Sequence, residues 1–247
     1  MDLKIEPMCL GEVVVDGSFL VWGWDQGTSY RIPFSSYLIL GGDHPVMVDA
    51  GARSVSDMRE EMGLEVFQSE EQTLEWNLAR HGLKPEDIGT LIITHLHVDH
   101  TGLADKLPNA SIYVQRAEMH YAAAPYFPPG FYDRVDIAKL VDPLYHQLKF
   151  LEGDAEIMPG VRVILTGGHA PAHQMVYVDV DSGQAIITGD NVYRKDPALK
   201  GPLLSPPGLV HNLADAMLAV EKIVHDGKHI LPMHDPAVYD EYPDGVY

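Results

Sequence analysis

The stretch Thr94-His95-Leu96-His97-Val98-Asp99-His100-Thr101-Gly102 contains four side chains that can bind a metal ion within six consecutive positions. Residues two apart on an extended segment point to the same side, so His95 and His97 can share one ion. Where the chain then turns towards a helix, Asp99 and His100 point in neighbouring directions and can reach a second ion. Burying these groups without a metal would leave several polar atoms unpaired, each costing about 1–3 kcal/mol. The spacing therefore predicts a site for two metal ions.

Three further potential ligands follow predicted strands or turns elsewhere in the chain: His169, Asp190 and His234. Loops at strand ends carry functional residues and gather at one edge of an α/β sandwich, so we expect all seven side chains to meet there. A carboxylate can bridge two ions, and nitrogen and oxygen donors without thiolate suit zinc, with manganese, iron or cobalt as alternatives. The sequence thus predicts two divalent metal ions as the cofactor, with zinc as the expected metal.

The remaining eight histidines are interpreted as hydrogen-bonded core or surface residues, because a lone histidine is more often a satisfied polar group than a ligand. They are His44, His81, His120, His146, His173, His211, His225 and His229. Replacing His173 or His211 by alanine is therefore expected to have a mild effect.

Outward from the histidine-rich stretch, short apolar runs alternate with segments of helical periodicity. The predicted strands are 12–16, 34–40, 46–48, 91–94, 111–114, 161–165, 175–180, 185–188 and 230–233. The predicted helices begin at the capping-box pair Ser69 and Gln72, at Ala117, and after the Asn212 cap. An aromatic and proline-rich loop at 126–132 could cover a site.

The segments 38–51 and 176–191 share one layout, in which a strand, a glycine-containing turn and a second strand lead to an aspartate beside a glycine. This similarity indicates a duplicated half. Since no linker or change of composition separates the halves, we predict one domain over residues 1–247. It belongs to the α/β class, with a two-layer sheet core and helices outside.

The charge of the chain limits its partners. There are 17 basic and 36 acidic residues, so the formal charge of −19 repels nucleic acid and anionic membrane surfaces. A small molecule is the expected partner. The first residues lack a basic region followed by an apolar run, and no segment is long enough to cross a bilayer, so we expect a cytoplasmic protein.

The ligand pattern resembles that of the metallo-β-lactamase superfamily over nearly the whole chain: His-x-His-x-Asp-His, a later Gly-His, an Asp after a strand and a final His. The resemblance implies an αββα sandwich of two mixed sheets with helices on the outer faces. It also implies that Asp49, which matches the first motif, is a structural acid or one that supports the ligands. The implied ligand sets are His95, His97 and His169 for one ion, and Asp99, His100 and His234 for the other, with Asp190 bridging.

Within that superfamily the chain most resembles the N-acyl-homoserine lactonases, which quench quorum sensing. The stretches that carry this resemblance are 95–100, 114–118, 152–154 with 159–161, 168–174, and Asp190 with Tyr193 three residues later. The resemblance implies that Tyr193 helps to bind the lactone and assists ring opening. Those lactonases occur as monomers and dimers, so the resemblance also implies a monomer or a homodimer. Asp99 and Asp190 are the other expected catalytic residues, since they can steer the proton of the nucleophile.

Two metal ions about 3.5–4 Å apart can activate a shared water and polarise a carbonyl group. We therefore expect a metal-dependent hydrolase that opens a lactone or ester by attack of a metal-bridging hydroxide. The alternatives are a hydrolase of thioesters, β-lactams or phosphoesters and, from a different class, an iron-dependent oxygenase on the same fold.

Overall fold

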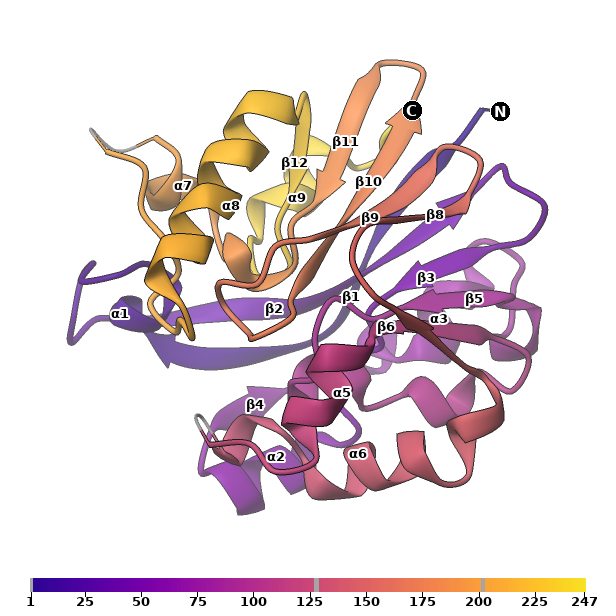
Figure 1. The fold of residues 1–247 in the computed structure, drawn as a ribbon, viewed down its shortest axis with the longest axis horizontal. Helices are drawn as coiled ribbons and strands as arrows, with labels where there is room; N and C mark the ends of the chain where they lie inside the picture. Colours follow the sequence, from indigo (N-terminus) through magenta and orange to yellow (C-terminus); the bar gives the residue numbers. More distant parts are fainter. Residues whose placement is uncertain (1, 127–128, 201–202) are drawn as a thin grey trace.

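The protein folds into two mixed β-sheets stacked face to face, with helices on the outer faces (Figure 1). The computed structural model describes residues 2–126, 129–200 and 203–247. One sheet has the strand order β4-β1-β2-β3-β5-β6-β7 and the other β12-β11-β10-β9-β8. This arrangement confirms the predicted αββα sandwich.

The strands of the two sheets follow each other along the chain, the first seven in one sheet and the last five in the other. Their bounds are β1 Lys4–Asp16, β2 Ser29–Leu40, β3 Val46–Val48, β4 Glu65–Phe67, β5 Thr90–Ile92, β6 Ser111–Gln115, β7 Leu148–Leu151, β8 Ala155–Met158, β9 Val161–Leu165, β10 Gln174–Val180, β11 Gly183–Ile187 and β12 His229–Leu231.

Helices connect the strands and cover the sheets, with α3, α5 and α6 on the larger sheet and α8 on the smaller one (Figure 1). The α-helices are α1 Gly17–Leu20, α2 Val55–Met62, α3 Leu74–Ala79, α4 Val98–Thr101, α5 Arg116–Ala122, α6 Arg134–Val141, α7 Lys195–Ala198, α8 Leu213–Asp226 and α9 Ala237–Glu241. Short 3-10 helices span Glu70–Gln72, Pro85–Asp87, Ala104–Lys106, Pro129–Phe131, Leu144–His146 and Gly189–Asn191.

The period of two along each strand produces the layers of the sandwich. In β3, Val46 and Val48 point into the apolar layer between the sheets, whereas Met47 points outward against the helices. In β10, Val176 faces the same inner layer, and Tyr177 lies in the outer cluster that includes α8. Residues buried on both faces explain why these strands are almost continuously apolar.

Several elements differ from the sequence-based expectation. The elements β4, β7, β8, α2 and α6 were not predicted, and β2 begins at Ser29 rather than at residue 34. Strand β1 begins at Lys4 rather than at residue 12, since Pro7 and an irregularity near Gly11 hide its alternating pattern. The helix predicted from Ser69 is divided, because Thr73 is extended and its hydroxyl caps a new helix by accepting a hydrogen bond from the Trp76 N–H. The predicted contact between Ser69 and Gln72 is present, however, ahead of the 3-10 helix.

The two segments with a common layout occupy corresponding places in the two sheets. The β2–β3 hairpin leads to Asp49, and β3 lies parallel to β5, after which His95 follows. The β10–β11 hairpin leads to Asp190, and β11 lies parallel to β12, after which His234 follows. Parallel strands that are neighbours end at the same edge of their sheet. The polar residues that follow these strands therefore lie together at that edge in both halves.

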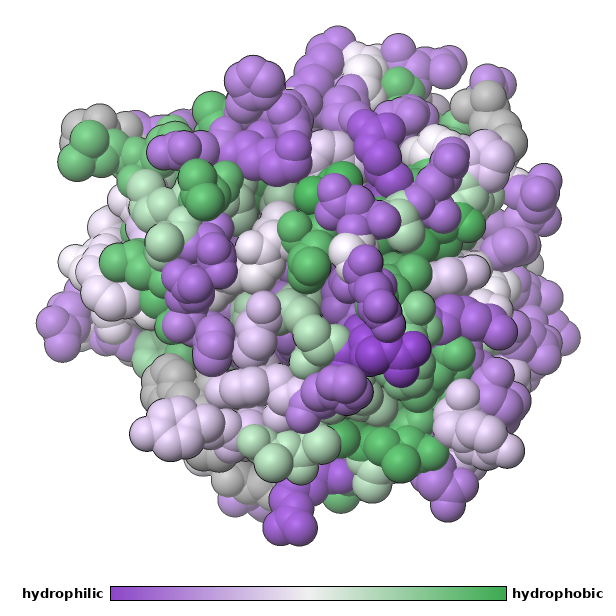
Figure 2. Space-filling model, viewed as in Figure 1, coloured by the Kyte–Doolittle hydropathy of each residue, from purple (hydrophilic) through white to green (hydrophobic). Residues whose placement is uncertain are grey.

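The face of the molecule drawn in Figure 2 is largely polar. Figure 2 shows hydrophilic side chains over most of this face, with hydrophobic ones in smaller, separate areas. Within the described parts of the chain, no helix has both the length and the apolar character needed to cross a membrane.

Candidate metal centre

The histidine-rich stretch leaves the buried strand β5 and makes one helical turn, α4. The extended His97 precedes that turn, so the residues after it point in new directions. Asp49 fixes the conformation, because its carboxylate accepts hydrogen bonds from both the N–H and the hydroxyl of Thr94, each at 2.7 Å. Asp49 also lies 2.8 Å from Nδ1 of His100. This buried acid therefore supports the stretch, as the resemblance implied.

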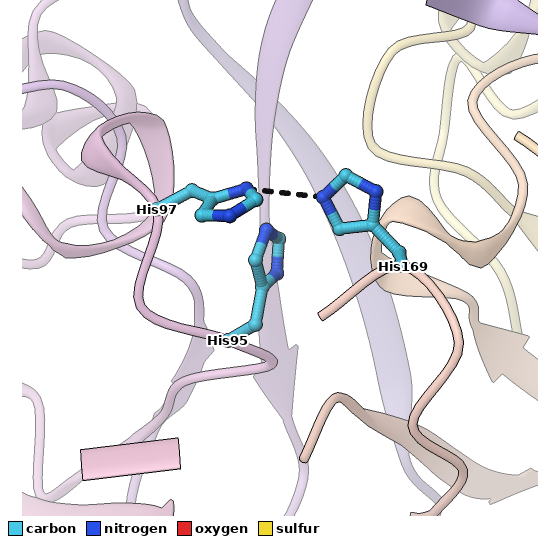
Figure 3. Close-up of side chains that lie close together, drawn as sticks. All are labelled: His95, His97 and His169. Atoms are coloured by element: carbon cyan, nitrogen blue, oxygen red, sulfur yellow. Dashed lines mark hydrogen bonds between the residues drawn. The ribbon is translucent and has the colours of Figure 1, made fainter. Parts of the chain in front are cut away.

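The first ligand group consists of His95, His97 and His169, whose potential ligand atoms all lie within 4.8 Å of one another. Figure 3 shows the three imidazoles converging from two separate segments. Nδ1 of His97 is 3.0 Å from Nε2 of His169. Atoms that bind one zinc ion tetrahedrally at 2.0–2.1 Å lie about 3.3 Å apart, so these nitrogens have the spacing of ligands to one ion.

The second ligand group consists of Asp99, His100 and His234. Oδ1 of Asp99 lies 3.6 Å from Nε2 of His100, and Oδ2 of Asp99 lies 3.6 Å from Nε2 of His234. These separations suit three ligands around one ion as well.

Asp190 lies between the two groups and presents one oxygen to each. Its Oδ2 is 3.5 Å from Nε2 of His169 and 3.9 Å from Nε2 of His95. Its Oδ1 is 3.4 Å from Nε2 of His100 and 3.1 Å from Nε2 of His234. A carboxylate in this position can bind two ions at once.

The other nitrogen of several of these imidazoles is held by a hydrogen bond, which orients the ring as is usual for metal ligands. Nδ1 of His169 donates to the Leu209 carbonyl at 2.7 Å, and Nδ1 of His234 donates to the Pro33 carbonyl at 2.8 Å. Among the described residues, several facing atoms have no hydrogen-bond partner although they are buried: Nε2 of His95, His100 and His234, and Oδ1 of Asp190. Buried polar atoms are normally paired, so this donor set fits bound cations.

The electrostatics of the centre agree with metal binding. Burial lowers the pKa of His95 and His97 well below the ordinary value, and the neutral imidazole is the form that binds a metal. Burial acts in the same direction on His100, but three neighbouring carboxylates outweigh it and raise its pKa well above the ordinary value. For Asp190, burial alone would raise the pKa, yet His234 and His100 hold it well below the ordinary value. The second group therefore favours added positive charge, which a divalent cation supplies.

Tyr193 lies beside the two groups, and its buried ring stacks on that of His234 with 4.8 Å between the centroids. Burial raises the pKa of Tyr193 well above its ordinary value, and the charges of Asp190 and Asp99 act in the same direction. The hydroxyl therefore keeps its proton. A protonated hydroxyl here can donate a hydrogen bond to an oxygen that gains negative charge.

A narrow pocket borders the centre at His97, Asp99, Asp190, Tyr193 and His234. It shares an apolar wall with an adjoining cavity of about 710 Å³. The shared wall consists of Phe19, Met58, Met62, Leu64, Val98 and Phe131. Apolar walls that lead to a few polar groups are typical of sites for small organic molecules.

The loop expected at 126–132 contributes to this wall. Residues 127 and 128 lie outside the described residues, but the end of the loop contacts the centre. The ring centroids of Phe131 and Tyr132 lie 5.5 and 4.7 Å from that of His97. This part of the loop therefore covers the first ligand group.

His173 is a hydrogen-bonded core residue, as the sequence predicted, but it is also a neighbour of Asp190. Its Nε2 accepts a hydrogen bond from the Asp190 N–H at 3.1 Å, and its Nδ1 lies 3.2 Å from the Thr166 hydroxyl. Gly189 has a φ of +53°, and a Cβ there would lie 2.2 Å from His173 Nε2. A second histidine four positions after His169 indicates a residue near the centre, but it does not indicate the partner of that residue. The expectation of a mild effect on removal does not fit this geometry.

We expect His173→Leu to lower kcat/KM about 10- to 100-fold and to weaken metal binding, because the Asp190 N–H loses its acceptor. His229 is a suitable control, because it lies outside the centre. Its Nε2 forms a hydrogen bond with the Ser182 hydroxyl, with 2.8 Å between the two atoms. His229→Leu should keep normal activity. Metal content and kinetics of both variants test this, and unchanged values for His173→Leu would restore the interpretation as a bystander.

Comparison with known proteins supports the same conclusion. The family model described as the metallo-β-lactamase superfamily matches residues 32–240. An N-acyl homoserine lactonase from Bacillus cereus is 31% identical over 195 residues, which cover 75% of this chain and 74% of that protein.

Solved structures show the same fold. An N-acyl homoserine lactone hydrolase with N-hexanoyl-L-homoserine at its catalytic metal centre aligns with a TM-score of 0.82 at 24% identity, covering 98% of each chain. AidC, a dizinc quorum-quenching lactonase, aligns with a TM-score of 0.71 at 16% identity, covering 95% of this chain and 88% of that one. With its two-sheet sandwich, its ligand-bearing strand ends and a family match over most of its length, the chain belongs to the metallo-β-lactamase superfamily.

Proposed function

We propose that this protein is a metal-dependent hydrolase that opens the ring of an N-acyl-homoserine lactone or a similar small lactone. The observation that carries the proposal is the position of Asp190, with one carboxylate oxygen towards each ligand group and Tyr193 beside it. The likeness to an N-acyl homoserine lactonase over three quarters of the chain supports the substrate class.

The proposed ligands are those that the geometry groups together. His95, His97 and His169 would hold one ion, Asp99, His100 and His234 the other, and Asp190 would bridge them. When bound, two divalent ions supply Lewis-acid activation of water and of the lactone carbonyl. Nitrogen and oxygen donors in compact groups, together with the dizinc site of a lactonase with this fold, support zinc as the metal.

Tyr193 and Asp99 would act directly on the substrate. The protonated hydroxyl of Tyr193 would donate to the oxygen that becomes negative as the carbonyl is attacked. Asp99 borders the same pocket, so its carboxylate could accept a proton from the attacking water and return it to the leaving alkoxide. Both residues would thus stabilise charge that develops in the transition state.

The apolar wall that the narrow pocket shares with the adjoining cavity would bind the acyl chain. This wall is built from methionine, leucine, valine and phenylalanine side chains next to the ligand groups, whereas the cavity beyond it is also lined by charged residues such as Arg53 and Asp57. Burial of each methylene group contributes about 0.8 kcal/mol, so a chain of several carbons adds substantially to binding. This wall favours an acylated lactone over a small polar ester.

A substrate panel tests the proposal. The zinc-loaded protein should open acyl-homoserine lactones, with a product heavier by one water in mass spectrometry, and should leave a chromogenic β-lactam and a phosphodiester nearly untouched. Oxygen consumption should be absent, which separates hydrolysis from an iron-dependent oxygenase. Faster turnover of the β-lactam or phosphodiester than of every lactone would overturn the proposed substrate class.

Tyr193→Phe should lower kcat/KM for the best lactone roughly 10- to 100-fold, because one donor to the developing negative charge is lost while the ring remains. Metal content should not change. Tyr177→Phe is a matched control, since it loses one hydrogen bond to Asp226 on the far side of the smaller sheet. Wild-type kinetics for Tyr193→Phe would remove this residue from the mechanism.

The remaining expectations stay predictions. They are a single domain over residues 1–247, a cytoplasmic location, and a monomer or a homodimer.

A further inference from the structure

Glu118 on α5 is a fully buried carboxylate that the proposed reaction does not use. Its Oε2 accepts a hydrogen bond from the Ala172 N–H at 2.8 Å. Its Oε1 accepts one from the Tyr132 hydroxyl at 2.9 Å and a longer one from the Leu96 N–H at 3.4 Å. Burying a carboxylate lowers the stability of the folded protein unless the group is paired or hydrogen-bonded, so a role for Glu118 is expected.

The three donors come from three segments that surround the first ligand group. Leu96 lies between His95 and His97, and Ala172 lies three residues after His169. The ring of Tyr132 meets that of His97 edge to face, with 4.7 Å between the centroids. One side chain therefore connects both loops that carry these imidazoles with the loop that covers them.

The arrangement suits the ionised form of Glu118. Both oxygens receive hydrogen bonds from N–H or O–H groups, and among the partners in the described part of the chain only the Tyr132 hydroxyl could accept a proton in return. Burial raises the pKa of Glu118 above its ordinary value, although these three hydrogen bonds act in the opposite direction, so it is the hydrogen-bond geometry that favours the carboxylate. An amide in place of the carboxylate would have to turn its NH₂ group towards the N–H of either Ala172 or Leu96, and that N–H would then lose its acceptor.

We propose that Glu118 is a positioning residue for the first metal ion. Its carboxylate holds the loop at His95 and His97 and the loop after His169 at the separation that lets three imidazoles bind one ion. Tyr132 extends this restraint to the covering loop. The proposal rests on the proposed function for its catalytic consequence, but its effect on metal binding is independent of the substrate.

The direct test is Glu118→Gln in the zinc- and cobalt-loaded protein. The first ion should bind about 10- to 100-fold more weakly, the typical cost of losing a group that orients metal ligands, and the visible spectrum of bound cobalt should change. The kcat/KM for the best lactone should fall by a similar factor. Glu152→Gln is the matched control, because Glu152 pairs only with Arg116 among the described residues and is exposed.

A purely structural role predicts a different result. In that case Glu118→Gln would lower the melting temperature while metal affinity and the cobalt spectrum stayed as in the wild type, and this outcome would overturn the proposal. Should Glu118→Gln fail to fold, Tyr132→Phe removes only one of the three donors. It should weaken binding of the first ion severalfold, and unchanged affinity would again contradict the proposal.

The two proposals fail separately. Altered metal affinity in Glu118→Gln supports the positioning role even if the wild-type protein opens no lactone. Lactone hydrolysis by the wild type together with unaltered metal binding in Glu118→Gln and Tyr132→Phe would reject the positioning role alone.

Discussion

Removal of both metal ions should abolish lactone hydrolysis, with a fall in rate of at least about 10³-fold, because the centre then lacks the Lewis acids that activate water and the carbonyl. The metal-free protein should also melt at a lower temperature. Binding to the folded state alone contributes roughly 2.7 kcal/mol at a free-ion concentration 100-fold above Kd. For a chain of this length that corresponds to about 5–10 °C.

The measurement compares protein purified without chelator, protein dialysed against chelator, and the dialysed protein after metal is added back. Zinc should restore both activity and melting temperature. Calcium should not, since it prefers six to eight oxygen ligands and this centre is rich in imidazole. Full turnover or an unchanged melting curve in protein shown to be free of metal would contradict the prediction.

Asp190→Asn should lower kcat/KM about 10²–10³-fold and reduce the metal content below two ions per chain. The substitution replaces one of two metal-facing oxygens by an NH₂ group, which cannot bind a cation, and removes a negative charge between the ligand groups. Both effects act at the point where the two groups meet, so the loss should exceed that of Tyr193→Phe.

Metal analysis and kinetics on one preparation of Asp190→Asn check this expectation. Asp226→Asn serves as the control, since Asp226 accepts hydrogen bonds from Tyr177 and Lys222 outside the centre. If Asp190→Asn kept two ions and a near-normal rate, Asp190 would not bridge them.

The residues that could be recognised in the sequence are those whose signal is local. The alternation of His95 and His97, and single polar residues after Gly189 or Met233, are visible in a few consecutive letters. Apolar strands before such residues then place them at a common edge, which the structure shows. For the same reason the strands predicted at 46–48, 161–165 and 175–180 and the long helix after Asn212 lie close to their observed bounds, whereas β4, β7 and β8 were not predicted.

The contacts that support the centre were not predictable in this way. Glu118 meets Leu96 and Ala172 only because α5 packs against loops from distant parts of the chain. The bond between His173 and the Asp190 N–H likewise depends on a turn with a positive φ at Gly189. Such contacts between distant residues produce no periodic pattern, so a single sequence does not indicate which residues will meet.

Each ligand group takes side chains from both halves of the sandwich. His95 and His97 follow a strand of the larger sheet, whereas His169 follows β9 of the smaller sheet. A metal ion in the first group would therefore act as a reversible cross-link between the sheets, closing a loop of more than seventy residues. Such a cross-link cannot form in a half-folded chain, because its donors are then far apart. Bound metal should consequently slow unfolding much more than it speeds folding, and the stability gained from it would be largely kinetic.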